Sequence, residues 1–314
     1  MQADGPSADY RIFGLNVRSG VLLPELAPRP FSAEPDVSIA QGTIAADHSL
    51  GDGMHSVDGA AVLVVGGVGR YLIEGGARIV VEPAAGADER NVRLFLLGSA
   101  FGVLIHQRGL LPLHANAIEI DGRAIAFTGA PGAGKSTLAA WFHDRDYSIL
   151  ADDVCVVRLD SKHRPVAVPG LPRLRLWREA LEASGRVVGS YQRSFLGDDD
   201  WDKYDVPLDS ERVAAGEAQL AAVYLLERGP ELRIEPLNGL DAAQVLIENT
   251  YRGEYIPAVG DAERHWRTCV ELAKRVPVFR VEREWQLSTF DRQVREVLLH
   301  VEAQLRSLAE HPRR

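Results

Sequence analysis

The stretch Gly129-Ala-Pro-Gly-Ala-Gly-Lys-Ser136 determines how the rest of this sequence is interpreted. It matches the full pattern of a phosphate-binding loop, in which spaced glycines precede a lysine and a serine. The apolar residues 123–128 directly before it predict a strand, and a helix is expected from about Lys135 to Arg145. A glycine-rich loop between a strand and a helix N-terminus can bind phosphate through backbone N–H groups and the helix dipole. The sequence therefore predicts a nucleotide site on an α/β sheet.

The residues of this loop divide the expected contacts among themselves. Lys135 is expected to reach the β- and γ-phosphates, and Ser136 to coordinate Mg²⁺. No Asn-Lys-x-Asp sequence that would recognise guanine occurs, so ATP with Mg²⁺ is the expected nucleotide. The candidate nucleotide-binding residues are Gly129, Ala130, Pro131, Gly132, Ala133, Gly134, Lys135, Ser136 and Thr137.

Two adjacent acids, Asp152 and Asp153, follow the next predicted strand at residues 147–151. Successive residues of an extended segment point to opposite faces, so the pair is expected to divide its roles. One carboxylate can hold Mg²⁺, and the other can accept the proton of an attacking hydroxyl. The alternative interpretation is a solvated turn.

His114 precedes a predicted strand at residues 115–120, which joins the strand of the loop through the turn Asp121-Gly122. Pairing of these two strands would bring His114 close to the phosphates. A single histidine is as often structural, and that alternative stays open.

A basic segment, Pro172-Arg-Leu-Arg-Leu-Trp-Arg178, lies further along the chain. Guanidinium groups pair well with carboxylates and phosphates, so the segment is a candidate acceptor- or phosphate-binding face. Lys203 ends an acidic loop that begins at Gly197, and it could contact a phosphate in transfer. A solvated surface is the alternative for both segments. The candidate contacts are Arg173, Arg175, Arg193 and Lys203.

The remaining pattern predicts two domains. Residues 1–88 are expected to form a β-rich N-terminal subdomain, a small antiparallel layer with strands at 61–65, 70–73 and 77–82 and a hairpin turn at Gly75-Gly76. Residues 89–314 are expected to form an α/β core that begins with a buried helix at 90–107. Its later part predicts a hairpin of 220–227 with 231–236, a strand at 276–281, and helices at about 240–251, 260–275 and 288–309.

Composition restricts the class of partner and compartment. The chain has 314 residues and a net charge of −9, which argues against broad binding to nucleic acid or anionic membranes. The most apolar run, residues 92–105, is shorter than the roughly 20 residues of a membrane span. The first nine residues lack the features of a signal peptide, and two cysteines without a paired motif fit a reducing compartment. We expect a cytoplasmic protein with no nucleic-acid or membrane partner.

The string from His114 through Asp153 resembles the HPr serine kinase/phosphorylase family and its smaller kinase-like relatives. The shared features are a histidine before a strand pair, the loop Gly129–Ser136 and the sequence Ala-Asp-Asp after the next strand. The resemblance implies a P-loop kinase core of the HPr-kinase type and a serine as phosphate acceptor. It implies Asp153 as the proton acceptor, with His114 and Lys135 as its partners and Ser136 as the magnesium ligand, which leaves Asp152 as the second metal candidate.

The same resemblance bears on partners. Relatives of this build accompany peptide-modifying gene clusters, including lasso-peptide clusters, so a serine-bearing peptide or protein is the implied acceptor. HPr kinases are hexamers, which implies a homo-oligomer. In the family a glutamate-rich stretch supports the reverse reaction, whereas residues 172–178 here are basic. Two alternatives stay open from the residues: a kinase for a small-molecule hydroxyl, and an NTP-hydrolysing regulatory or binding module.

Overall fold

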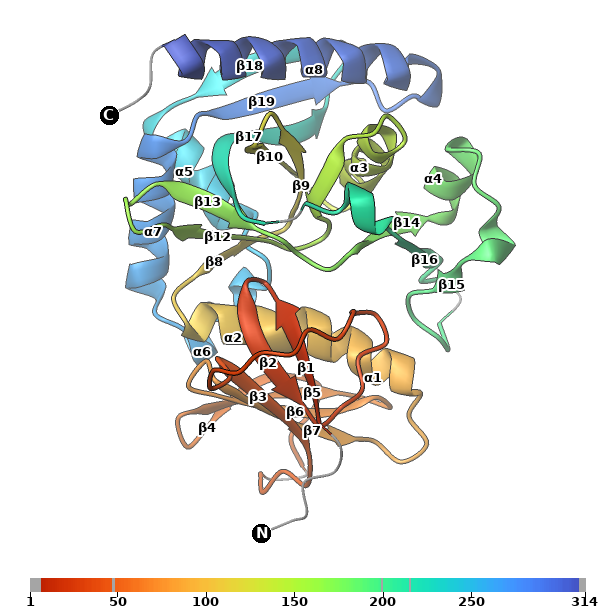
Figure 1. The fold of residues 1–314 in the computed structure, drawn as a ribbon, viewed down its shortest axis with the longest axis vertical. Helices are drawn as coiled ribbons and strands as arrows, with labels where there is room; N and C mark the ends of the chain where they lie inside the picture. Colours follow the sequence, from red (N-terminus) through yellow and green to blue (C-terminus); the bar gives the residue numbers. More distant parts are fainter. Residues whose placement is uncertain (1–6, 47–48, 199, 215, 311–314) are drawn as a thin grey trace.

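The computed structural model describes residues 7–46, 49–198, 200–214 and 216–310. They form a mixed α/β fold of two bodies, which lie one above the other in Figure 1 with a long helix between them. Residues 1–6 of the segment considered above for a targeting signal, and Asp199 of the acidic loop, lie outside the described residues. Of the helices in the described ranges, none combines the length and apolar character needed to cross a bilayer.

The first body is built on a seven-stranded sheet in the order β1-β2-β3-β7-β6-β5-β4. The predicted turn is confirmed, because Gly75 and Gly76 have φ values of 57° and 66° between the antiparallel strands β6 and β7. The sheet is larger than the expected antiparallel layer and is mixed, since β3 runs parallel to both β2 and β7. The strands are β1 (Ala8–Ile12), β2 (Leu15–Ser19), β3 (Val37–Gln41), β4 (Gly53–Val57), β5 (Ala60–Val65), β6 (Gly69–Glu74) and β7 (Arg78–Pro83).

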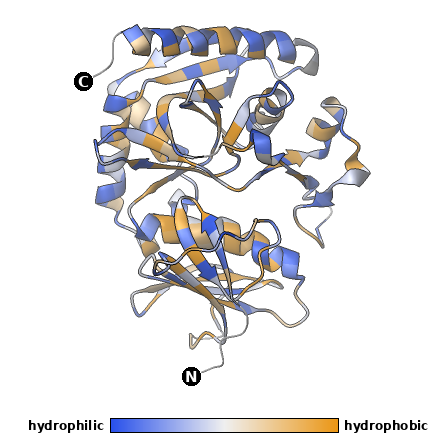
Figure 2. Cartoon of the chain, in the orientation of Figure 1, coloured by the Kyte–Doolittle hydropathy of each residue, from blue (hydrophilic) through white to orange (hydrophobic). Residues whose placement is uncertain are grey.

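The helix between the bodies has three parts: α1 (Glu89–Phe95), a π-helical turn η1 (Leu96–Ala100) and α2 (Phe101–Gln107). Asp88 caps its start by accepting a hydrogen bond from the Arg90 backbone N–H at 2.8 Å. Figure 2 shows hydrophobic residues concentrated along α2. Phe101 and Leu104 are fully buried in the hydrophobic core that also contains the first sheet. The domain boundary after residue 88 stays a prediction, and the helix that follows it packs on the first sheet.

The second body contains the strand that leads into the glycine-rich loop. Strand β10 pairs antiparallel with β9 and parallel with β17, so the predicted hairpin around Asp121 is confirmed. The sheet follows the order β11-β9-β10-β17-β13-β12-β8, with β19 and β18 joined beyond β17. Its strands are β8 (Leu111–Leu113), β9 (Ala115–Ile120), β10 (Arg123–Thr128), β11 (Ser148–Ala151), β12 (Cys155–Leu159), β13 (Pro165–Val168), β17 (Ala218–Arg228), β18 (Arg233–Leu237) and β19 (Val278–Arg283).

The predicted hairpin between β17 and β18 is wrong, because β19 lies between them. Strand β19 runs parallel to β17 and antiparallel to β18. Strand β17 is buried along almost its whole length, whereas β18 is half exposed. A strand buried on both faces belongs in the centre of a sheet, and the half-exposed strand takes the edge.

Helices cover both sides of this sheet. Figure 1 shows α8 along the outer face beside β18 and β19, and Val294, Val297 and Val301 of that helix are buried in the core. The helices predicted in the last third are confirmed to within a few residues. The helical segments are α3 (Lys135–His143), α4 (Arg178–Ala183), η2 (Val188–Ser190), η3 (Ser210–Arg212), α5 (Gly239–Glu248), η4 (Gly253–Tyr255), α6 (Ile256–Val259), α7 (Ala262–Arg275) and α8 (Leu287–Glu310).

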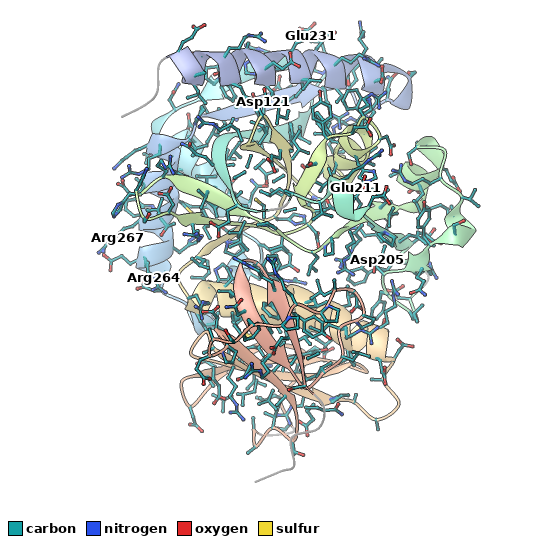
Figure 3. The ribbon with its side chains drawn as sticks, viewed as in Figure 1. Asp121, Asp205, Glu211, Glu231, Arg264 and Arg267 are labelled. Atoms are coloured by element: carbon teal, nitrogen blue, oxygen red, sulfur yellow. The ribbon has the colours of Figure 1, made fainter. Side chains whose placement is uncertain are left out.

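A third, small sheet of β14 (Arg173–Trp177), β16 (Lys203–Pro207) and β15 (Gln192–Arg193) carries the basic segment. Leu174 and Leu176 are fully buried in the core that contains α3, whereas Arg173 and Arg175 alternate with them and point the other way. Asp205 lies opposite Arg175 in the register, and Figure 3 shows it where this sheet meets the first body. The sheet thereby carries a charged face toward the space between the two bodies.

Candidate active site

The glycine-rich loop lies between the end of β10 and the start of α3, as its sequence predicts. Gly129, Gly132 and Gly134 have φ values of 140°, 84° and 85°, which side-chain-bearing residues rarely adopt. Gly129 also approaches β17 closely, because a Cβ on it would lie 2.5 Å from the carbonyl oxygen of Leu226. The loop therefore needs glycine both for its backbone angles and for its packing on the neighbouring strand.

Lys135, the first residue of α3, is folded back onto the loop. Its Nζ donates hydrogen bonds to the carbonyl oxygens of Gly129 at 2.7 Å and of Ala130 at 3.2 Å. The side chain is buried, and this desolvation lowers the pKa of Lys135 to about 8. The ammonium group is charged at neutral pH and lies over the loop that would hold the phosphates.

Ser136 and Asp152 form the pair that fits a magnesium ion. The Ser136 hydroxyl donates to Oδ1 of Asp152 at 3.0 Å, and the Arg175 backbone N–H donates to Oδ2 at 2.7 Å. Burial raises the pKa of Asp152 to about 6; the negative charge of Asp153 adds to the rise, and the bonds from Arg175 and Ser136 offset it only in part. A divalent cation would supply that compensation. Mg²⁺ commonly binds through one or two protein oxygens together with substrate phosphates, and Ser136 and Asp152 would supply the protein oxygens.

Asp153 lies in a left-handed backbone conformation, with a φ of 71°, in the turn after β11. This turn, rather than the alternation of a strand, directs the two acids to different partners. Arg175 donates from Nη1 to Oδ2 of Asp153 at 2.8 Å. Burial alone would raise the pKa of Asp153, but the positive charge of Arg175 and its neighbours outweighs it and lowers the pKa to about 2. The carboxylate is therefore ionised at neutral pH.

His114 stands between β8 and β9, beside Asp153. Its Nδ1 lies 3.0 Å from the backbone oxygen of Asp153 and 3.6 Å from the carboxylate oxygen Oδ1. A carbonyl oxygen can only accept, so Nδ1 carries the hydrogen and Nε2 keeps its lone pair. Burial lowers the pKa of His114, which favours the neutral ring. Thr128, at the end of β10, fixes the backbone here by donating to the His114 oxygen at 2.9 Å.

Two adjoining cavities meet at these residues. One, of about 390 Å³, is lined by the loop, by Lys135, Ser136 and Thr137, and by Trp177. The other, of about 480 Å³, lies between the loop and the helix of the first body. Both cavities are lined by His114, Pro131, Asp153 and Lys203. The junction carries the carboxylate, the histidine and an amine together.

The structure separates the four candidate acceptor contacts. Lys203 and Arg175 line the second cavity, and Lys203 Nζ lies 5.0 Å from the ring of Trp177. Arg173 is held by Asp205 at 2.9 Å and lines neither cavity. Arg193 binds Asp202 at 3.1 Å and lines a separate hollow beside α1. The basic segment is thus paired with carboxylates of the same chain, and only part of it faces the site.

Several neighbours of the site were not predicted. Asn116 donates from its side chain to the Lys135 oxygen, and Arg283 donates from Nη2 to the Ala133 oxygen at 3.1 Å. The ring of Tyr251 lies 6.0 Å from that of His114. A polar residue in an apolar strand was a usable signal for Asn116. Arg283 and Tyr251 come from distant parts of the chain, and nothing local marks them.

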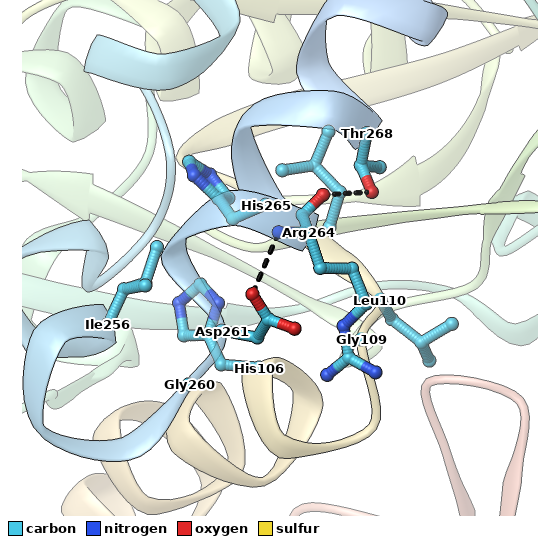
Figure 4. Close-up of a pocket in the computed structure, with 10 residues that line it drawn as sticks. His106, Gly109, Leu110, Ile256, Gly260, Asp261, Arg264, His265 and Thr268 are labelled. Atoms are coloured by element: carbon cyan, nitrogen blue, oxygen red, sulfur yellow. Dashed lines mark hydrogen bonds between the residues drawn. The ribbon is translucent and has the colours of Figure 1, made fainter.

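A second polar group lies away from the loop, at the contact of α2 with α7 (Figure 4). His106 hydrogen-bonds the Tyr251 oxygen at 2.9 Å, and His265 contacts the Thr250 hydroxyl at 2.8 Å. Burial lowers the pKa of both histidines. The pocket between them holds about 10 Å³, room for roughly one water. In the described part of the chain no group of three or more His, Cys, Asp and Glu side chains could hold a metal ion.

No protein-family model matches the chain, and no curated protein sequence matches it. Among solved structures, it is similar to the HPr(Ser) kinase/phosphatase from Coxiella burnetii, with a TM-score of 0.32 and 13% identity over 64% of this chain and 99% of that chain. This similarity is weak, and the chemistry of the site rests on its own residues.

Proposed function

We propose that the protein is an ATP- and Mg²⁺-dependent kinase that transfers the γ-phosphate to a serine hydroxyl of a peptide or protein. The observation that carries the proposal is the position of Asp153. Its carboxylate lines both the cavity beside the phosphate-binding loop and the cavity that opens toward the first body. A hydroxyl in the second cavity and a phosphate in the first would meet at this side chain.

The half of the site that binds ATP would hold the phosphates with charged side chains and backbone N–H groups. The loop and the N-terminus of α3 would hold the phosphates, and Lys135 would move from the loop carbonyls to the phosphate oxygens. Ser136 and Asp152 would hold Mg²⁺, which neutralises phosphate charge when bound. Lys203, at the junction, adds a cation where charge develops on the transferred group.

The acceptor half needs positioning more than a strong base. The hydroxyl oxygen forms a bond to the γ-phosphorus, the bond between that phosphorus and the β,γ-bridging oxygen breaks, and ADP leaves. The hydroxyl proton passes to a carboxylate oxygen of Asp153. The pKa of about 2 makes this carboxylate a weak base. A weak base is sufficient for a loose phosphoryl-transfer transition state, because the hydroxyl is oriented first and loses its proton late. The unprotonated Nε2 of His114 offers a second acceptor.

The wider assignment is part of the same proposal. The string from His114 through Asp153 supports a P-loop kinase core of the HPr-kinase type at residues 89–314, joined to an N-terminal subdomain at 1–88. The resemblance of this string extends the proposal to a peptide acceptor, such as a lasso-type precursor, and to a homo-oligomer. The proposed cytoplasmic location rests on the two cysteines without a paired motif.

The test is transfer of label from [γ-³²P]ATP to serine-containing peptides, with wild type, Asp153→Asn and Lys135→Ala. We expect Asp153→Asn to lose transfer by about 10²- to 10⁴-fold while it still binds ATP. Lys135→Ala should lose both. Equal loss of binding and transfer in Asp153→Asn would contradict the assigned role. Label on a small hydroxyl compound alone would favour the small-molecule kinase, and fast hydrolysis without acceptor would favour the regulatory module.

A further inference from the structure

The second cavity has walls from both bodies and is larger than the phosphate cavity. One wall is the helix of the first body, at the point where it becomes a π-helical turn. Gly98 and Ser99 of this turn line the cavity directly. Single π-helical turns inside α-helices occur frequently at functional sites. The opposite side of the same cavity carries Asp153 and His114.

Tyr251 also lines this cavity and packs against the helix of the first body. A Cβ on Gly98 would lie 3.2 Å from the Tyr251 hydroxyl, and one on Gly102 would lie 3.0 Å from its ring. The two glycines therefore form a notch that receives this side chain. The Tyr251 backbone N–H also donates to the Pro112 oxygen at 2.8 Å, in the strand directly before His114. This wall is thus held in a fixed position relative to the reactive residues.

A third wall comes from the loop between β15 and β16. Asn91 of α1 binds the backbone of Leu196 twice, donating to its oxygen at 2.7 Å and accepting from its N–H at 2.9 Å. Arg90 adds an ion pair with Asp205 at 2.7 Å. These bonds anchor the loop that carries Trp201, and the strand β16 that follows it, to the first body.

Three aromatic rings meet where this loop contacts the helix. The ring centroids of Phe95 and Phe195 are 6.1 Å apart, and those of Phe195 and Trp201 are 5.3 Å apart. All three side chains are half-buried, so each keeps part of its surface available. Phe95 and Trp201 line the same cavity as Asp153. We call these three rings the aromatic cluster.

We propose that this cavity is the acceptor site, and that the aromatic cluster binds an aromatic or aliphatic side chain flanking the phosphorylated serine. The inference rests on the proposed function and names its substrate class: a peptide segment with an apolar residue near the serine. A segment in the cavity would place its hydroxyl at Asp153 and bury its apolar neighbour against Phe95 and Trp201. Burial of apolar surface against aromatic rings is favourable and does not require a charged partner.

The test uses arrays of synthetic peptides with one central serine and [γ-³²P]ATP. Each flanking position carries Phe, Leu, Ala, Asp or Lys in turn. The enzymes are wild type, Phe95→Ala, Trp201→Ala and the control Trp266→Ala, an exposed tryptophan on α7. For wild type we expect a preference of about tenfold for Phe or Leu over Asp at one or more flanking positions. Phe95→Ala and Trp201→Ala should each raise the KM for the preferred peptide about tenfold, with KM for its Ala version and ATP affinity unchanged.

The possible results distinguish failure of the acceptor-site inference from failure of the kinase proposal. A wild-type preference for charged flanks, or a preference for apolar flanks that survives in both variants, overturns the acceptor-site inference and leaves the kinase proposal standing. Labelling of no peptide by a wild-type enzyme that binds ATP overturns both. Urea denaturation reports whether Phe95→Ala folds, and Trp201→Ala tests the same surface from an independent loop.

Discussion

The affinity for ATP should fall steeply above pH 8, because Lys135 is buried against the loop. Burial lowers the pKa of Lys135 to about 8 in the free protein. Phosphate binding needs the protonated amine, so above that pH each binding event must first take up a proton. Well below pH 8 Lys135 is fully protonated, so this side chain adds no pH dependence to the ATP affinity there.

The magnitude follows from the protonated fraction. Between pH 7.5 and pH 9 a lysine of pKa 8 predicts an increase in the ATP dissociation constant of about eightfold. A lysine at its ordinary pKa, near 10.4, predicts almost no change over the same range. The expected rise is therefore a direct consequence of burial.

The assay is fluorescence titration with a methylanthraniloyl derivative of ATP at pH 7.5, 8, 8.5 and 9. Lys135→Arg is the matched control, since a guanidinium stays charged throughout. The wild-type constant should rise while that of the variant stays flat. A flat wild-type profile would refute the buried environment assigned to Lys135, and an equal rise in the variant would assign the effect to another group.

Three further changes test the surrounding structure. Asp153→Asn should lower the free energy of unfolding by about 2 kcal/mol at pH 7. This stabilisation by the ionised carboxylate is present above the unfolded pKa near 3.9 and is lost as the pH falls toward 2. Urea titrations that show the same difference between wild type and variant at pH 7 and at pH 2.5 would contradict it. Gly129→Ala should lower the free energy of unfolding by at least about 2 kcal/mol and abolish most ATP binding, because the φ of 140° and the 2.5 Å approach to the Leu226 oxygen exclude a Cβ. Retained nucleotide binding in this variant would contradict the loop geometry. Asn91→Ala should lower the free energy of unfolding by about 2 kcal/mol, because both hydrogen bonds to Leu196 are lost, and it should leave the affinity for ATP unchanged. Urea denaturation measures the first effect and nucleotide titration the second.

The donor half of the site was predictable because its signals are local. The glycines, Lys135 and Ser136 lie in one stretch whose backbone needs are visible in the sequence. The turn at Asp121-Gly122 fixed the pairing of β9 with β10 and so brought His114 beside the loop. These features depend on residues that are close together in the chain, so a single sequence is enough to predict them.

The remaining features depend on contacts between distant segments. Arg175, predicted as an acceptor contact, lines the second cavity and also forms an ion pair with Asp153 that no local pattern indicates. Strand β19 separated two strands that looked like a hairpin, since the buried β17 required neighbours on both edges. Strands β3 and β4 lie in residues 20–58, a stretch rich in proline, glycine, alanine and aspartate, so no pattern predicted them. Strands β1 and β2 are only five residues long each and were not predicted either. Their partners are chosen by burial in the folded chain.

The most direct test of the central claim is the coupling between ATP consumption and an acceptor. ADP release and phosphoserine formation should be measured in the same reaction, with and without a serine peptide that the arrays identify. Transfer across the Asp153 junction predicts one phosphoserine for each ADP and little ADP without peptide. ADP release that proceeds equally fast without peptide, with no phosphoserine formed, would contradict it.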